Sequence, residues 1–74
     1  MDYNDKIITM DDNQKYMVIE QVNYENGTYL YLVNNKDERD AKFVKVEDDK
    51  IIQIDPKLFE TKILPLFLDK MSKY

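Results

Sequence analysis

Short runs of alternating apolar residues, separated by polar turns, fill the chain as far as residue 54, and one amphipathic run fills the rest. Alternation at a period of two is typical of half-buried strands, whereas recurrence every three or four residues indicates a helix. A series of strands followed by a helix predicts the α+β class. We therefore expect one small domain over residues 1–74, an antiparallel β-meander of four or five strands within 6–54 closed by a C-terminal helix over 56–72.

The longest alternating run covers residues 15–24. Its alternation puts Tyr16, Val18, Val22 and Tyr24 on one face, and Met17 and Ile19 on the other. Ten residues exceed the usual strand length of about five or six. We expect a β-bulge or bend near Glu20-Gln21, where polar residues interrupt the pattern.

Turn signals separate the strands. Asn26-Gly27 between two alternating runs is a strong hairpin signal, and a type I′ turn there would need positive φ at both residues. The next run places Tyr29, Tyr31 and Val33 on one face and Leu30 and Leu32 on the other. Shorter polar segments at 11–14 and 48–49 predict two further turns.

The C-terminal run begins with a helix signal, Asp55 as the N-cap and Pro56 at the first helical position. Its apolar residues recur at helical spacing on a broad stripe: Phe59, Ile63, Leu66 and Phe67, widened by Leu64, Leu68 and Met71. Pro65 lies inside this pattern, and proline lacks the N–H that a regular helix requires. We expect a kink there, or a break into 56–63 and 65–72.

Missing residue types exclude most catalytic chemistry. The chain has no histidine and no cysteine, and Gly27 is its only glycine. Catalysis near neutral pH relies largely on histidine, activated cysteine or glycine loops that hold phosphate. We therefore predict a protein that is not an enzyme and that needs no cofactor and no metal.

Composition also limits the setting and the partners. The absence of cysteine favours the cytoplasm, since small secreted domains are usually rich in disulfides. Residues 1–6 resemble no signal peptide, and no apolar run is long enough to span a bilayer. With 15 acidic residues against 11 basic ones, the net charge of −4 disfavours nucleic acid and anionic membranes. Abundant Lys, Asn, Tyr and Ile indicate an AT-rich genome, that of a low-GC bacterium or its phage.

Two residue groups suggest a binding site but have a simpler explanation. The acidic run Asp11-Asp12-Asn13 could bind calcium, yet it lacks the glycine and the spaced acids of an EF-hand loop, so we interpret it as a solvated turn. Tyrosines on the central strands could stack nucleobases, but few cations lie among them. Packing within the sheet explains them better.

The chain carries more apolar surface than one helix can cover. Both faces of the hairpin 15–33 are apolar, and the helical stripe is too broad for a single contact. Either the sheet curls and buries this surplus itself, or the surplus binds another protein or a second copy. We favour a homodimer with an interface drawn from Tyr29, Tyr31, Val33, Leu64, Leu68 and Met71.

A resemblance to a known family rests on three segments: 7–13 (IITMDDN), 16–19 (YMVI) and 22–33 (VNYENGTYLYLV). In this order they resemble the YrzB-like family, small acidic proteins of low-GC bacteria with a domain of unknown function. The likeness extends over roughly residues 6–68 and implies a β-meander with a terminal helix. It implies no catalytic residues. This chain differs in having Pro65 and more lysine.

We therefore expect a non-enzymatic interaction or regulatory module that self-associates in the cytoplasm. One alternative is a small barrel of the SH3-like or OB-like type that contacts nucleic acid or a nucleoprotein complex. The number of predicted strands allows such a barrel, but the negative net charge of the chain disfavours contact with nucleic acid. Another alternative is a phage-encoded inhibitor that binds a host protein.

Overall fold

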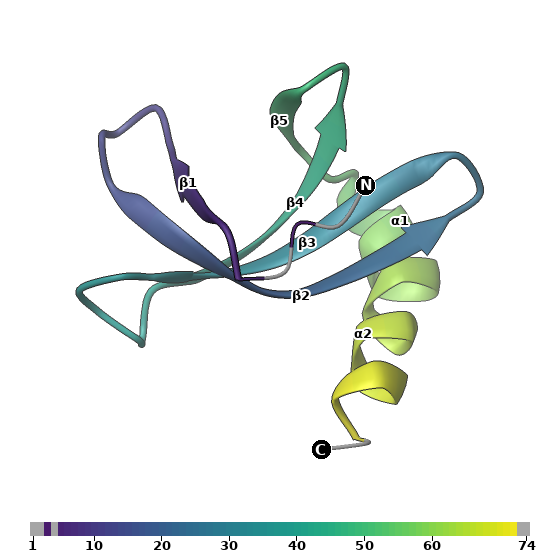
Figure 1. The fold of residues 1–74 in the computed structure, drawn as a ribbon. Coiled ribbons are helices and arrows are strands. Elements are labelled where there is room, and N and C mark those ends of the chain that lie inside the picture. Colours follow the sequence, from purple (N-terminus) through teal and green to yellow (C-terminus); the bar gives the residue numbers. More distant parts are fainter. Residues whose placement is uncertain (1–2, 4, 73–74) are drawn as a thin grey trace.

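A computed structural model describes residues 3 and 5–72 of the chain. Its elements follow the predicted order, a five-stranded antiparallel sheet and then one C-terminal helix (Figure 1). The strands are β1 (Ile7–Thr9), β2 (Lys15–Tyr24), β3 (Gly27–Asn34), β4 (Ala41–Glu47) and β5 (Lys50–Gln53). The helix has three parts, α1 (Pro56–Leu58), a π-helical turn η1 (Phe59–Ile63) and α2 (Leu64–Met71). The predicted α+β meander is confirmed.

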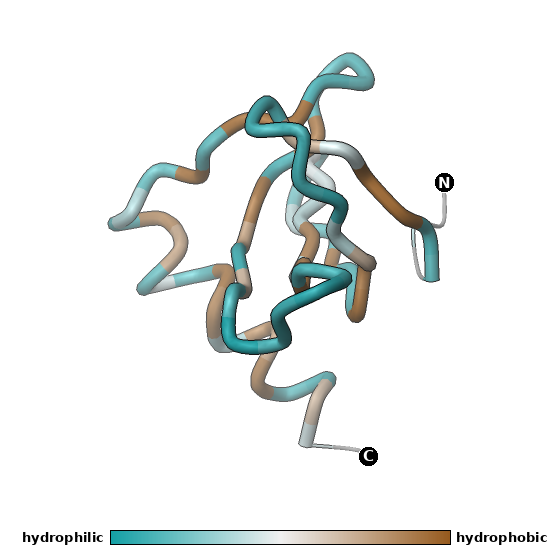
Figure 2. The backbone as a smooth tube through the Cα atoms, turned by 90° about the vertical axis from the view of Figure 1, so that its left-hand side faces the viewer, coloured by the Kyte–Doolittle hydropathy of each residue, from teal (hydrophilic) through white to brown (hydrophobic). Residues whose placement is uncertain are grey.

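The sheet is a simple meander in which each strand pairs with its neighbours in sequence, in the order β1-β2-β3-β4-β5. It curls into a half-barrel, and in Figure 1 β1 and β5 rise on opposite sides of its concave face, which we call the trough. The helix lies against the outer side of the sheet, which we call the helix side; the trough is the inner side. Polar residues gather in the turns between strands (Figure 2).

A β-bulge in β2 decides which residues face each side. Val18 pairs with Leu32, but Glu20 pairs with Tyr31, so Ile19 is an extra residue without a partner in β3. The predicted bulge is therefore confirmed, one residue earlier than expected. Because one extra residue reverses the alternation, the prediction of a single face from residue 16 to residue 24 is wrong.

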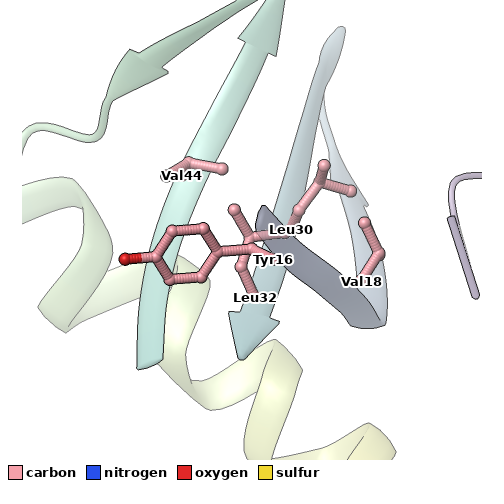
Figure 3. Packing of buried hydrophobic residues seen from close by; sticks show 5 residues of the cluster. All are labelled: Tyr16, Val18, Leu30, Leu32 and Val44. Atoms are coloured by element: carbon pink, nitrogen blue, oxygen red, sulfur yellow. The ribbon is translucent and has the colours of Figure 1, made fainter. Parts of the chain in front are cut away.

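The inner core lies in the trough and is built from the first half of β2 together with β3 and β4. Its buried members are Tyr16, Val18, Leu30, Leu32 and Val44 (Figure 3). Tyr3, Ile8, Met10, Val46 and Ile51 are partly buried against them. The curled sheet thus buries Leu30 and Leu32 without any partner chain, which was one of the two outcomes considered for the surplus apolar surface.

The helix-side core forms between the helix and the second half of β2, β3 and β4. Its buried members are Val22, Tyr29, Ile54, Ile63 and Phe67. Phe43 is the centre of an aromatic group, with ring centroids 4.7 Å from Tyr31, 4.8 Å from Phe59 and 5.0 Å from Phe67. Such offset and edge contacts add to the energy of burial. Of the predicted helical stripe, Ile63 and Phe67 are buried in this core, and Phe59 and Leu66 are partly buried against it.

The helix begins as predicted and widens where the proline requires it. Asp55 is the N-cap with Pro56 at the first position, although the Asp55 side chain caps no described N–H group. Before Pro65 the Leu64 N–H donates to the Phe59 carbonyl, five residues back, which makes a π turn. A regular α-helix would press the proline ring against the Thr61 carbonyl. The wider turn lets one helix continue where we expected a kink or a break.

Three of the turns between paired strands place non-glycine residues at positive φ: the β1–β2, β2–β3 and β4–β5 turns. In the β2–β3 hairpin Tyr24 pairs with Gly27, so the two turn residues are Glu25 and Asn26. Glu25 has φ 54°, whereas the φ of Gly27 is not positive. The predicted type I′ turn at Asn26-Gly27 is therefore wrong, because Gly27 already belongs to β3.

Gly27 has a steric role in β3. A Cβ atom there would lie 2.9 Å from Cε2 of Tyr29, which is closer than a real Cβ contact. The absence of a side chain lets the Tyr29 ring lie over the strand backbone.

Turn 48–49 between β4 and β5 lies where the sequence predicts it. Asp48 and Asp49 adopt φ of 52° and 63°, and the flanking Glu47 and Lys50 pair with each other. Positive φ at both residues is the backbone of a type I′ turn, which glycine and asparagine adopt with less strain than aspartate.

A buried carboxylate ties the helix to the bulge. The Glu20 side chain is almost fully buried, and its Oε1 lies 3.3 Å from Nζ of Lys70 in α2. The same ammonium donates to the backbone carbonyl of Gln21 at 2.5 Å, and the Gln21 N–H donates to Glu20 Oε1 at 3.1 Å. The bulge therefore turns the Glu20 carboxylate and the Gln21 carbonyl toward α2, where both contact the Lys70 ammonium.

Candidate interaction surfaces

The residues predicted for the interface do not form one exposed surface. Tyr29 is buried in the helix-side core and Tyr31 is half-buried against Phe43. Leu64 and Met71 are half-buried, and Leu68 is 58% exposed. Val33 is also half-buried. It belongs to a larger apolar surface that the sequence analysis did not predict.

Register brings four apolar residues into one row across the sheet. Ile7 pairs with Met17, Met17 with Val33, and Val33 with Ala41. Directly paired residues lie on the same face, and Val33 shares its face with Tyr29 and Tyr31. We call these four residues the outer apolar row; it lies on the helix side, two residues from the pair formed by Tyr31 and Phe43.

The outer apolar row is open to solvent. Ile7 is 55% exposed and Met17 is 36% exposed, and the bulged Ile19 next along β2 is 41% exposed. Four neighbouring strands at a spacing of about 4.8 Å give a row roughly 14 Å long. The sequence placed Met17 and Ile19 on the same face, but only the pairing of β1 and β3 with β2 shows that Ile7 and Val33 extend that face.

A polar network closes the end of the trough near the 34–40 loop. The Tyr16 hydroxyl donates to Oδ2 of Asp40 at 2.6 Å, and Nδ2 of Asn34 donates to the same oxygen at 3.1 Å. These bonds, the one from Tyr16 first, hold the pKa of Asp40 below its ordinary value. The network ties the start of β2 to the 34–40 loop.

Next to this network, a polar cavity of about 260 Å³ is lined by residues of the 13–15 and 34–36 segments. Asn34 links the two segments, since its Nδ2 donates to Oε1 of Gln14 at 3.3 Å and its Oδ1 accepts from the Lys36 N–H at 2.8 Å. The bond between Asn34 and Gln14 holds the two segments together.

The acidic turn 11–14 is a turn as predicted. The Gln14 N–H donates to Oδ1 of Asp12 at 2.9 Å, and Asn13 has φ 63°. Oδ2 of Asp12 lies 4.0 Å from Nζ of Lys42. Within residues 3 and 5–72, acidic, His and Cys side chains form no group of three that could hold a metal ion.

The strand tyrosines are used inside the protein. Tyr16 and Tyr29 are buried in the inner and helix-side cores, and Tyr31 stacks on Phe43. Lysines lie over two of these rings, Lys42 Nζ 5.0 Å from the Tyr16 centroid and Lys45 Nζ 5.8 Å from the Tyr29 centroid. These rings therefore pack within the sheet, as the sequence favoured.

Comparison with known proteins adds no identity: no family model, no curated protein and no solved structure matches the chain. The resemblance to the YrzB-like family stays a prediction. Among the described residues, no helix is long and apolar enough to cross a membrane.

Proposed function

We propose that this chain is a non-enzymatic protein-interaction module that acts as a cytoplasmic homodimer, joined through the outer apolar row. One observation carries the proposal. Ile7, Met17 and Val33 form a continuous apolar strip across three strands, and neither the helix nor the trough covers it. Contiguous apolar surface of this kind marks interaction sites more reliably than scattered single residues.

A second copy is the occupant that suits this row best. The row is uncharged and lies across the strands, so a two-fold axis through it would place row against row, as in sheet-on-sheet packing. A domain of 74 residues without disulfides has a small core, and self-association is a common way to extend it. Of the interface residues predicted from the sequence, Val33 contacts the partner in this proposal. Tyr29 and Tyr31 lie in or against the helix-side core of the same chain.

Sedimentation at tens of micromolar tests the proposal. The wild-type chain should sediment at twice its chain mass of 8.9 kDa. Met17→Lys should shift it to monomer, because the charge would be buried between two sheets. Ile52→Lys is a matched control, since Ile52 is a strand residue of equal exposure (37% against 36%) on β5. A monomeric wild type, or a dimer that Met17→Lys leaves intact, would contradict the proposal.

A further inference from the structure

The half-barrel is open along one seam. Within the described residues β1 and β5 are the two edges of the sheet, and each has a strand neighbour on one side only. In Figure 1 they stand opposite each other across the trough. A strand edge presents unpaired N–H and C=O groups, which are a template for another strand.

Turn 48–49 determines which backbone groups of β5 face outward. Glu47 and Lys50 flank the turn and pair with each other, so the N–H and C=O of Lys50 point to β4. In an antiparallel ladder these groups alternate in direction along the strand. Ile52 therefore also bonds to β4, while the backbone groups of Ile51 and Gln53 point to the open edge.

A cavity of about 440 Å³ lies between the two edges. It is lined by Thr9 of β1, by Met10 and Asp11 directly after it, and by residues 49–52 in and before β5. A second cavity of about 490 Å³ adjoins it along β4 and β5 and shares Met10, Asp11, Ile51 and Ile52. Met10 and Ile51 pack on the inner core, so the floor of the seam is apolar and continuous with that core.

The mouth of the seam is acidic. The turns 11–14 and 48–49 contain four aspartates and no cation. Asp11 and Asp49 line the cavity itself. Two cations also line the seam: Lys50 lines the first cavity, and Lys42 lines the second, with its Nζ 4.0 Å from Oδ2 of Asp12. An apolar floor between acidic turns suits a ligand that is apolar and basic.

We propose that the seam binds an extended segment of a partner protein in which apolar residues alternate with Lys or Arg, added as a strand to the open edge of β5. Main-chain bonds to Ile51 and Gln53 hold the segment, its apolar side chains cover Met10 and Ile51, and its cations lie near Asp11 and Asp49. This site is separate from the outer apolar row and does not depend on the dimer.

Selection from a library of random twelve-residue peptides displayed on phage tests the proposal, with the full wild-type chain as bait. Enriched peptides should alternate apolar residues with Lys or Arg. A synthetic copy of the most enriched peptide should slow amide exchange at Ile51 and Gln53. Gln53→Pro removes one outward N–H from an exposed edge position and should weaken that peptide about fivefold or more.

Charge variants provide a second measurement that does not depend on proline being tolerated. Asp11→Asn with Asp49→Asn should weaken the peptide about tenfold at low salt, and added salt should reduce the difference. Glu38→Gln with Glu60→Gln has the same net charge away from the seam and should leave affinity within about twofold. Enrichment of acidic peptides, no enrichment, or equal affinity for the Asn pair and its control would overturn the proposal.

Discussion

The most specific stability prediction concerns turn 48–49. Both of its residues are non-glycine and have positive φ, a backbone conformation that strains a residue with a side chain. Asp49 has φ 63° and Asp48 has φ 52°. The left-handed conformation costs an ordinary L-residue about 1–2 kcal/mol, and less for aspartate. Glycine removes that cost but loses up to about 1 kcal/mol through the freer unfolded chain. Removing the repulsion between the Asp48 and Asp49 carboxylates stabilises the folded state by about a few tenths of a kcal/mol more.

Asp49→Gly should therefore stabilise the domain by about 0.5–1 kcal/mol, equivalent to a rise in Tm of about 3–6 °C for a domain of this size. Chemical denaturation with an unchanged m-value gives the free energy directly. Asp11→Gly is the control: Asp11 is also an exposed turn residue, but its φ is not positive. That change should destabilise by about 0.5 kcal/mol. If both variants are destabilised equally, the strain assigned to turn 48–49 is absent.

Three further predictions follow from single contacts. Lys70→Met should destabilise the domain by about 2 kcal/mol in a denaturant titration, because the buried Glu20 carboxylate loses its cation. This value lies between those of exposed and buried ion pairs, since Lys70 itself is half exposed. Lys70→Arg should recover most of the lost stability. Gly27→Ala should cost about 1 kcal/mol through its contact with the Tyr29 ring, and Tyr29→Leu in the same chain should make that change nearly neutral. The lowered pKa of Asp40 means that its contribution to stability is complete above about pH 4 and is lost as the pH falls through its folded-state pKa; Asp40→Asn should flatten acid unfolding curves in that range.

Periodicity was enough to predict most of the fold. Alternation located every strand within a few residues, and Asp55-Pro56 located the start of the helix. These signals are local, because strand period and helix capping depend on neighbours in sequence. The bulge was also predicted from local length and polarity, within one residue of its position. Its effect was not predicted: the extra residue turns Val22 and Tyr24 to the side opposite Tyr16 and Val18.

What the sequence could not predict depends on pairing between distant residues. The outer apolar row exists because register aligns Ile7 with Met17 and Met17 with Val33. No one strand displays that strip by itself. The contact of Lys70 with the bulge is likewise long-range, because Lys70 and Gln21, whose carbonyl it contacts, are 49 positions apart in the sequence. The π turn before Pro65 was predicted only in part. The proline indicated an irregular helix at this position, but not that the helix would widen by one residue and continue.

The contact across the proposed dimer can be observed directly by isotope-filtered NMR on a mixture of labelled and unlabelled chains. If the outer apolar row joins the two copies, intermolecular cross-peaks should link the methyl groups of Ile7, Met17 and Val33, and dilution should weaken them together. Cross-peaks confined to Leu68 or Ile52, or none at a concentration where sedimentation shows a dimer, would contradict an interface formed by the outer apolar row.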